Sequence, residues 1–201
     1  MKKLDEKATE VADYDKMYIS EIVKAEKYSF DSQSVRPYFD YPVVRDGIMK
    51  LTSELFGVRF TQVDNPEVWQ ADVDCYQVWE GDKLLGRIYL DMHPRDGKFG
   101  HAAQFSIRGG VEGVQCPIGV LVCNFPGGNG AAPGEGLMSH DDVETFLHEF
   151  GHLMHHTFGG HQKWIEQSGV ATEQDFVEAP SQFLEEWAWD APTLQRFAKH
   201  Y

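Results

Sequence analysis

The spacing of apolar residues divides the chain into a helical beginning, a strand-rich middle and a helical end. Residues 5–28 are mostly polar, with a sparse apolar stripe at helical spacing formed by Val11, Tyr14, Tyr18, Ile22 and Val23. A turn-rich stretch with Pro37 and Pro42 follows, and residues 44–56 then predict a second helix, which Gly57 ends. We expect each of these helices to bury its apolar face.

Between residues 58 and 124 the pattern changes to short apolar segments separated by turn residues. Four of these segments predict strands, at residues 75–79, 84–91, 102–107 and 118–124. The last segment is apolar almost throughout, so we expect it to lie in the centre of the sheet. The pattern predicts an α+β fold with N-terminal helices and a mixed sheet of four or five strands.

The next predicted helix covers residues 139–159, after a Gly/Pro-rich connector at residues 125–136. Ser139 and Asp142 have the spacing of a capping box, and Gly159-Gly160 is a stop signal. One face of this helix is apolar, with Val143, Phe146, Leu147, Phe150, Met154 and Thr157. The opposite face carries Asp141, Glu144, His148, His152 and His155.

The polar face contains the pattern H-E-x-x-H, which is typical of zinc sites. His148 and His152 lie one helical turn apart, so both imidazoles can reach one Zn²⁺. Glu149 is rotated from His148 by about 100°, which places it beside the metal ligands, where it can act as a base toward water. Gly151 costs about 1 kcal/mol relative to alanine in a helix, and it therefore indicates that another element approaches the backbone there.

A catalytic zinc usually has three protein ligands, so one more must come from elsewhere. The metzincin pattern requires glycine at position 155 and histidine at position 158, but the chain has His155 and Phe158. His155 lies about 10 Å from His148 along the helix axis, too far to share the ion. The roles left for His155 are contact with a substrate, support of a ligand, or packing.

A glutamate from a following helix, the gluzincin arrangement, remains, and residues 176–189 fit it. Glu178, Gln182 and Glu185 share one face of this predicted helix, opposite an apolar face formed by Phe176, Pro180, Phe183 and Trp187. Pro180 places Glu178 in the first turn. Spacing favours Glu178 only modestly over Glu185 as the third ligand, and it leaves Gln182 or Glu185 to hold a ligand in place.

Charge and composition limit the classes of binding partner and the cellular compartment that we expect for this chain. The chain has 18 basic and 32 acidic residues, a formal net charge of −14, which argues against nucleic acid and anionic membranes as partners. Neither a secretory signal nor an apolar run long enough to span a bilayer is visible. The 3 cysteines show no disulfide or zinc-binding spacing. We therefore expect a cytoplasmic protein.

Two linked motifs resemble the zinc metallopeptidase family of thimet oligopeptidase, neurolysin and oligopeptidase A. They are Phe-Leu-His-Glu-Phe-Gly-His-Leu-Met-His at 146–155 and Asp-Phe-Val-Glu-Ala-Pro-Ser-Gln at 175–182. The resemblance continues through residues 89–91 and 98–103 and ends at His200-Tyr201. It implies one zinc ion per chain, held by His148, His152 and Glu178, with Glu149 as the catalytic base. It thereby favours Glu178 over Glu185.

The resemblance also implies short peptides as substrates. It favours the strand at residues 101–107 as a sheet edge to which a peptide adds, with His101 and Ala102 as substrate contacts and His155 as a further candidate. We expect residues 1–57 to form a helical part and residues 58–201 a zincin-like catalytic core, as one continuous unit.

Members of the family are longer, so we expect this chain to be the middle of such an enzyme, with the remainder of the peptidase as a partner. One alternative is a zinc-binding fragment with weak activity or none. The other is an interaction domain without a metal.

Overall fold

A single five-stranded sheet organises the computed structural model, which describes residues 11–128 and 131–201. The strands are β1 (Arg59–Gln62), β2 (Asp74–Glu80), β3 (Lys83–Asp91), β4 (Ala103–Arg108) and β5 (Ile118–Val122). Their order across the sheet is β1-β2-β3-β5-β4. β3 and β5 are parallel and the other neighbours are antiparallel, so the predicted α+β fold with a mixed sheet is confirmed.

The last two strands lie close to their predicted positions. β5 is an interior strand between β3 and β4, as its continuous apolar pattern indicates, although β3 and not β5 is the middle strand, and β4 forms one edge of the sheet. β5 ends at Val122, two residues earlier than predicted. Beyond this end Cys123 and Phe125 still donate backbone hydrogen bonds to Asp91 and Met92, and the Asn124 side-chain amide donates to the carbonyls of Phe99 and His101 in the loop before β4.

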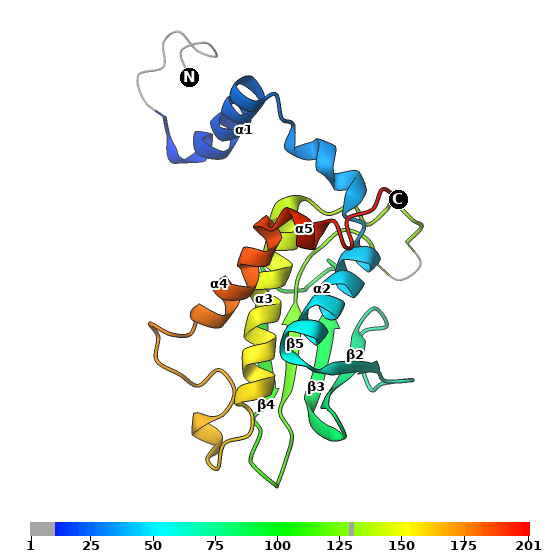
Figure 1. The fold of residues 1–201 in the computed structure, drawn as a ribbon, viewed down its shortest axis with the longest axis vertical. Coiled ribbons are helices and arrows are strands. Elements are labelled where there is room, and N and C mark those ends of the chain that lie inside the picture. The colour runs from blue at the N-terminus through cyan, green and yellow to red at the C-terminus, as the bar shows by residue number, and fades with distance from the viewer. Residues whose placement is uncertain (1–10, 129–130) are drawn as a thin grey trace.

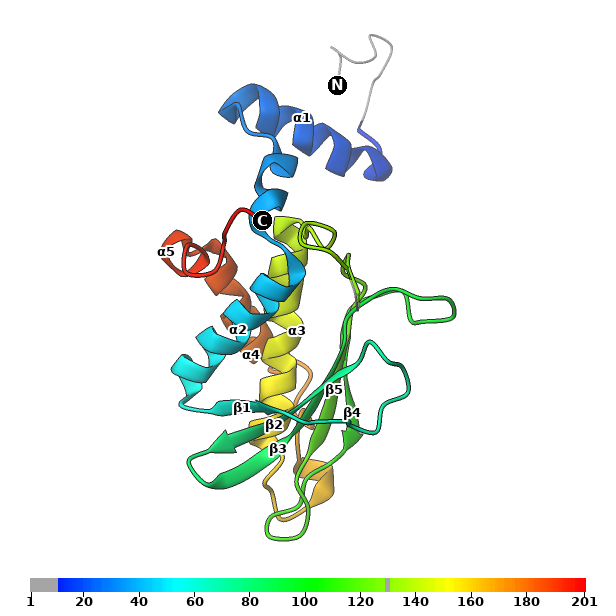
Figure 2. The same ribbon diagram turned by 90° about the vertical axis from the view of Figure 1, so that its right-hand side faces the viewer.

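Helices α2, α3 and α4 lie on one face of this sheet (Figure 2). The α-helices are α1 (Lys16–Tyr28), α2 (Tyr41–Phe56), α3 (His140–Gly159), α4 (Ala179–Glu185) and α5 (Ala191–Leu194). Short 3-10 helices cover Asp13–Asp15, Ser32–Tyr38, Ile165–Gln167 and Glu186–Trp189. No helix in the described part of the chain is long and apolar enough to cross a membrane.

The first helix differs from its prediction. Residues 5–10 of the predicted helix lie outside the described residues, and the α-helix begins only at Lys16. No residue of α1 is buried, and Tyr18 is 63% exposed. The expected burial of its apolar stripe is therefore wrong for the described residues, because α1 lies apart from the sheet and the other helices (Figure 1).

The second helix buries its apolar face, as predicted. It begins at Tyr41 rather than at residue 44, because Pro42 falls in the first turn, where a missing N–H costs nothing. Gly57 ends it with a φ of 67°. Val44 and Ile48 belong to the same hydrophobic core as residues of the sheet and α3. The division of the chain at residue 57 stays a prediction.

The third helix forms the centre of the core. Phe146, Leu147 and Phe150 are completely buried, and each such side chain contributes roughly 1.5–3 kcal/mol through burial. The predicted capping box is present, since Ser139 Oγ accepts from the Asp142 N–H and Asp142 accepts from the Ser139 N–H. Because the apolar face is turned to the sheet, the face with His148 and His152 is turned toward α4 and the residue before it, where Glu185 and Glu178 lie.

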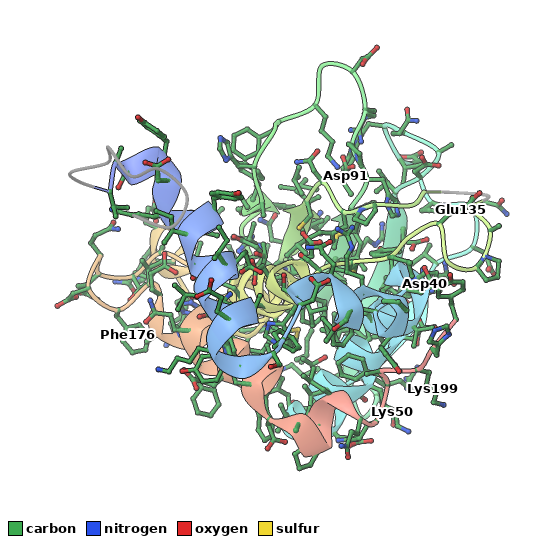
Figure 3. All side chains as sticks on the ribbon, turned by 90° about the horizontal axis from the view of Figure 1, so that it is seen from above. Asp40, Lys50, Asp91, Glu135, Phe176 and Lys199 are labelled. Carbon is green, nitrogen blue, oxygen red and sulfur yellow. The ribbon has the colours of Figure 1, made fainter. Side chains whose placement is uncertain are left out.

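The fourth helix is shorter than predicted and packs through another face. α4 begins at Ala179, so Glu178 is its N-cap residue, and the helix continues from Glu186 to Trp189 as a 3-10 helix. The predicted apolar face is wrong, because Phe176 and Phe183 are exposed while Ser181, Leu184 and Ala188 are buried. Figure 3 shows Phe176 at the periphery of the molecule. At the closest approach of α4 to α3, Ser181 lies against Gly151, where there is no room for a larger side chain.

Candidate metal centre and cleft

Two helices bring three possible metal ligands to one point. His148 and His152 come from α3, and Glu178 comes from the residue that precedes α4. Glu178 Oε2 lies 3.2 Å from His148 Nε2 and 3.0 Å from His152 Nε2. One ligand atom from each residue lies within 4.8 Å of the other two. The structure thus brings together the three residues that the sequence pattern and the resemblance named.

The donor set fits zinc. Two imidazole nitrogens and one carboxylate oxygen are ordinary zinc ligands, and three protein ligands leave one position of a tetrahedral ion open. Two ligand atoms at 2.0–2.1 Å from a tetrahedral ion lie about 3.3 Å apart, close to both nitrogen–oxygen distances. The side chains of His148 and His152 are 25% and 12% exposed and that of Glu178 is 49% exposed, so the site is open to solvent.

Glu185 is hydrogen-bonded to the first of the two histidines. Its Oε2 lies 2.7 Å from His148 Nδ1. A neutral imidazole makes this hydrogen bond by donating the N–H of Nδ1 to the carboxylate. The tautomer with a proton on Nδ1 leaves Nε2 with a lone pair, and Nε2 is the atom that faces Glu178. A carboxylate behind a metal-binding imidazole holds the ring in this orientation. Glu185 therefore lies behind His148 and not beside Glu178.

Glu149 lies in a cleft between α3, the edge strand and the segment that precedes α4. The cleft has a volume of about 400 Å³ and is lined by Ala103, Gln104, His148, Glu149, His152, Val170, Gln174, Val177 and Glu178. Burial raises the pKa of Glu149, although the two histidines and the backbone of Gln104 oppose this shift. A carboxylate with a raised pKa is a stronger base, as a residue that accepts a proton from water requires.

The electrostatic environment of Glu178 has the opposite result. Burial favours the neutral acid, but the Ser181 hydroxyl, His152 and His148 outweigh it and lower the pKa of Glu178. Two neighbouring carboxylates thus have pKa values shifted in opposite directions. The one that faces the imidazoles is kept ionised, and the one beside them is made more basic.

Four other predicted site residues lie outside this group. His101 is exposed before β4 and Ala102 is half-buried, and the cleft wall begins one residue later, at Ala103. His155 packs with its ring 6.2 Å from that of Phe176 and does not line the cleft. The Gln182 side chain is exposed and makes no hydrogen bond to another described residue. Of the two residues predicted to hold a ligand in place, Gln182 and Glu185, only Glu185 makes the expected contact.

Sequence reasoning missed Ser181, which is hydrogen-bonded to Glu178. It also missed the part of the cleft wall that the segment connecting α3 to α4 forms, through Val170, Gln174 and Val177. The spacing of three residues from Glu178 to Ser181 was available as a helical signal. No comparable signal marks the wall, because residues 170–177 form no regular element.

A second cluster of possible metal ligands and a second cavity lack the arrangement of ligand atoms seen at His148, His152 and Glu178. His140, Asp141 and Glu144 cluster at the start of α3, but His140 Nε2 bonds the Ala188 carbonyl and Glu144 accepts from Trp189. A cavity of about 460 Å³ lies between the start of α2, residues 127–128 and 131–136, and residues 199–201. Backbone and small apolar residues form most of its lining.

Comparison with known proteins gives one consistent result. All of residues 1–201 match the model of peptidase family M3. The chain is 36% identical over 196 residues to the thimet-like oligopeptidase of Dictyostelium discoideum, covering 94% of this chain and 29% of that protein. It is 33% identical over 200 residues to saccharolysin of Saccharomyces cerevisiae, covering 94% of this chain and 27% of that protein.

A bacterial relative agrees with these two. Oligopeptidase A of Escherichia coli is 32% identical over 201 residues, covering 96% of this chain and 29% of that protein. The chain therefore spans less than a third of the length of these curated relatives. The match of its full length to the family model confirms the resemblance of the two linked motifs, and the chain belongs to peptidase family M3.

Proposed function

We propose that this chain is the catalytic core of a zinc metallopeptidase, of gluzincin type, that hydrolyses peptide bonds in short peptides. The observation that carries the proposal is the approach of Glu178 Oε2 to His148 Nε2 and His152 Nε2, at 3.2 and 3.0 Å. Membership of family M3 supports peptidase activity, and two of the relatives are named oligopeptidases.

The ligand residues have distinct roles in this proposal. His148, His152 and Glu178 hold one zinc ion per chain, and Glu185 keeps Nδ1 of His148 protonated. The bound ion supplies a Lewis acid that polarises the scissile carbonyl and lowers the pKa of water to about 7. Glu149 accepts the proton of the attacking water and passes it to the leaving amine.

The edge strand is the proposed binding surface for the peptide. β4 pairs with β5 on one side, and its other side has no neighbouring strand among the described residues. Its first residues, Ala103 and Gln104, line the cleft with Glu149. A substrate in extended conformation can add to this free edge through main-chain hydrogen bonds. His101 and Ala102 then flank the bound peptide, and His155 stays a weaker candidate for substrate contact.

The length of the chain favours a second candidate function. Because the chain spans less than a third of its relatives, it can act as a zinc-binding fragment that turns over slowly without the remainder of the peptidase. In either case we propose no nucleic-acid or membrane partner, because the net charge is −14. A cytoplasmic location also stays a proposal.

Hydrolysis of an internally quenched fluorescent peptide by the zinc-loaded chain tests the function. Glu149→Gln should retain zinc and lower the rate by about 10²- to 10⁴-fold, because a general base contributes that much. Glu144→Gln is the matched control, because Glu144 lies five residues earlier on the same helix and accepts a hydrogen bond from Trp189 instead. It should keep both zinc and rate.

Each outcome of this experiment decides between the candidates. Equal rates for the unchanged chain and Glu149→Gln, above background, would refute the role of Glu149. A chain that binds zinc with no measurable hydrolysis would favour the second candidate. A chain without zinc affinity, measured by metal analysis after dialysis, would contradict both.

A further inference from the structure

We infer that Ser181 is a positioning residue for the metal centre, because its hydroxyl holds the Glu178 carboxylate with one oxygen turned toward the two imidazoles. The inference rests on the proposed zinc site and adds a residue to it. Ser181 does not approach the substrate in this arrangement, and its effect passes through Glu178.

The hydrogen bond reaches the oxygen that matters. Ser181 Oγ lies 2.9 Å from Glu178 Oε2 and 2.8 Å from the Glu178 carbonyl oxygen, so its one proton serves either acceptor. Oε2 is also the atom that lies 3.2 and 3.0 Å from the nitrogens of His148 and His152. A hydroxyl that donates to this oxygen restricts rotation of the carboxylate about its last bond.

Glu178 needs this restraint more than the histidines do. Its side chain is 49% exposed, against 25% for His148 and 12% for His152. Glu178 is the N-cap residue of α4, and its side chain makes no capping hydrogen bond. An exposed glutamate has several rotamers available and loses conformational entropy when a metal immobilises it. A prior hydrogen bond from a buried group removes part of that cost.

The fold presents the hydroxyl to Glu178 from a fixed place. Ser181 is completely buried, and its backbone lies against Gly151, which stands between the two histidines on α3. A Cβ added to Gly151 would lie 2.6 Å from Ser181 Cα, so a side chain at position 151 would not fit. The contact that brings α4 to α3 therefore also fixes the origin of the hydrogen bond.

One face of α4 thus serves two ligands. Glu178, Ser181 and Glu185 are spaced by three and four residues, which places them on the side of the helix that faces α3. Glu185 bonds Nδ1 of His148, and Ser181 bonds Oε2 of Glu178. Removal of such supporting partners typically lowers metal affinity about 10- to 100-fold.

The experiment compares zinc affinities by competition with a chromophoric chelator in the full chain. Ser181→Ala should weaken zinc binding about 10- to 100-fold. Ser168→Ala is the matched control, because it also removes a buried serine hydroxyl, one without a hydrogen-bond partner among the described residues. This control should bind zinc as tightly as the unchanged chain. Circular dichroism of the metal-free variants should show the same helix content.

A double-mutant cycle separates positioning from a general structural effect. In a chain that already carries Glu178→Ala, the further change Ser181→Ala should alter zinc affinity less than threefold, because the carboxylate it held is gone. Full zinc affinity in Ser181→Ala, or an equal loss with and without Glu178, would overturn the inference while leaving the proposed function intact. Absence of zinc binding by the unchanged chain would overturn the proposed function and this inference together.

Discussion

Gly151→Ala is the substitution that best separates fold stability from metal binding. Gly151 lies in α3 between His148 and His152, and α4 packs directly on it. An added Cβ would lie 2.6 Å from Ser181 Cα and 2.8 Å from the Pro180 carbonyl oxygen. Both neighbours are backbone atoms, so no side-chain rotation relieves the contact. Ordinary carbon contacts lie at about 3.5–4.0 Å, and α4 must therefore retreat by about 1 Å.

Two opposing effects decide the stability of this variant. Alanine gains about 1 kcal/mol over glycine in a helix interior, while overpacking costs about 1–3 kcal/mol. The net destabilisation is about 1 kcal/mol, or a decrease in Tm of about 2–4 °C. Metal–ligand distances tolerate only about 0.2 Å. Glu178 lies three residues before Ser181 and moves with it, so zinc affinity should fall about tenfold or more.

Differential scanning calorimetry of the metal-free chain and chelator competition for zinc measure the two effects separately. Gly100→Ala is the control, because an added Cβ there meets no atom within 4 Å and the residue has no left-handed φ. Gly151→Ala with unchanged zinc affinity would refute the reasoning, since Glu178 would then be positioned independently of the contact between the helices. A rise in Tm with reduced zinc affinity would show that helix propensity outweighs overpacking.

Two further predictions concern carboxylates. Glu178→Gln should lower zinc affinity much further than Glu185→Gln, for which we expect a loss of about 10- to 100-fold, because His148 and His152 remain as the only ligands of the proposed set. Equilibrium dialysis in which the two variants exchange these results would contradict the assignment. Burial tends to raise the pKa of Asp91, but hydrogen bonds from Arg95, Lys98 and Trp69 outweigh it and lower the pKa to about 2. The pKa of Asp91 is lower in the folded state than its unfolded value of about 3.9. At pH values above 3.9 the ionised carboxylate therefore stabilises the fold by roughly 2 kcal/mol, and this stabilisation is lost as the pH falls toward 2. Urea unfolding at pH 5 and pH 2 should show a smaller loss of stability in Asp91→Asn than in the unchanged chain, and equal losses would refute the contribution.

The sequence by itself determined the features that depend on residues close together in the chain. The capping box at Ser139, the apolar face of α3 and the spacing of His148 and His152 follow from the helical repeat, and the structure shows all three. The interior position of β5, with a strand on each side, followed from its continuous apolar run. Gly151 in the interior of a helix also indicated that another element approaches closely, but the sequence did not identify that element.

The tertiary structure alone decided how separate elements meet. Spacing left Glu178 and Glu185 as competing ligands, and only the packing of α4 on Gly151 places one beside both imidazoles and the other behind His148. The same close packing turned Phe183 outward and Ser181 inward, against the apolar pattern of the segment. Periodicity reports which residues share a face, but the distance between two faces depends on contacts between residues far apart in the chain, which a local pattern does not contain.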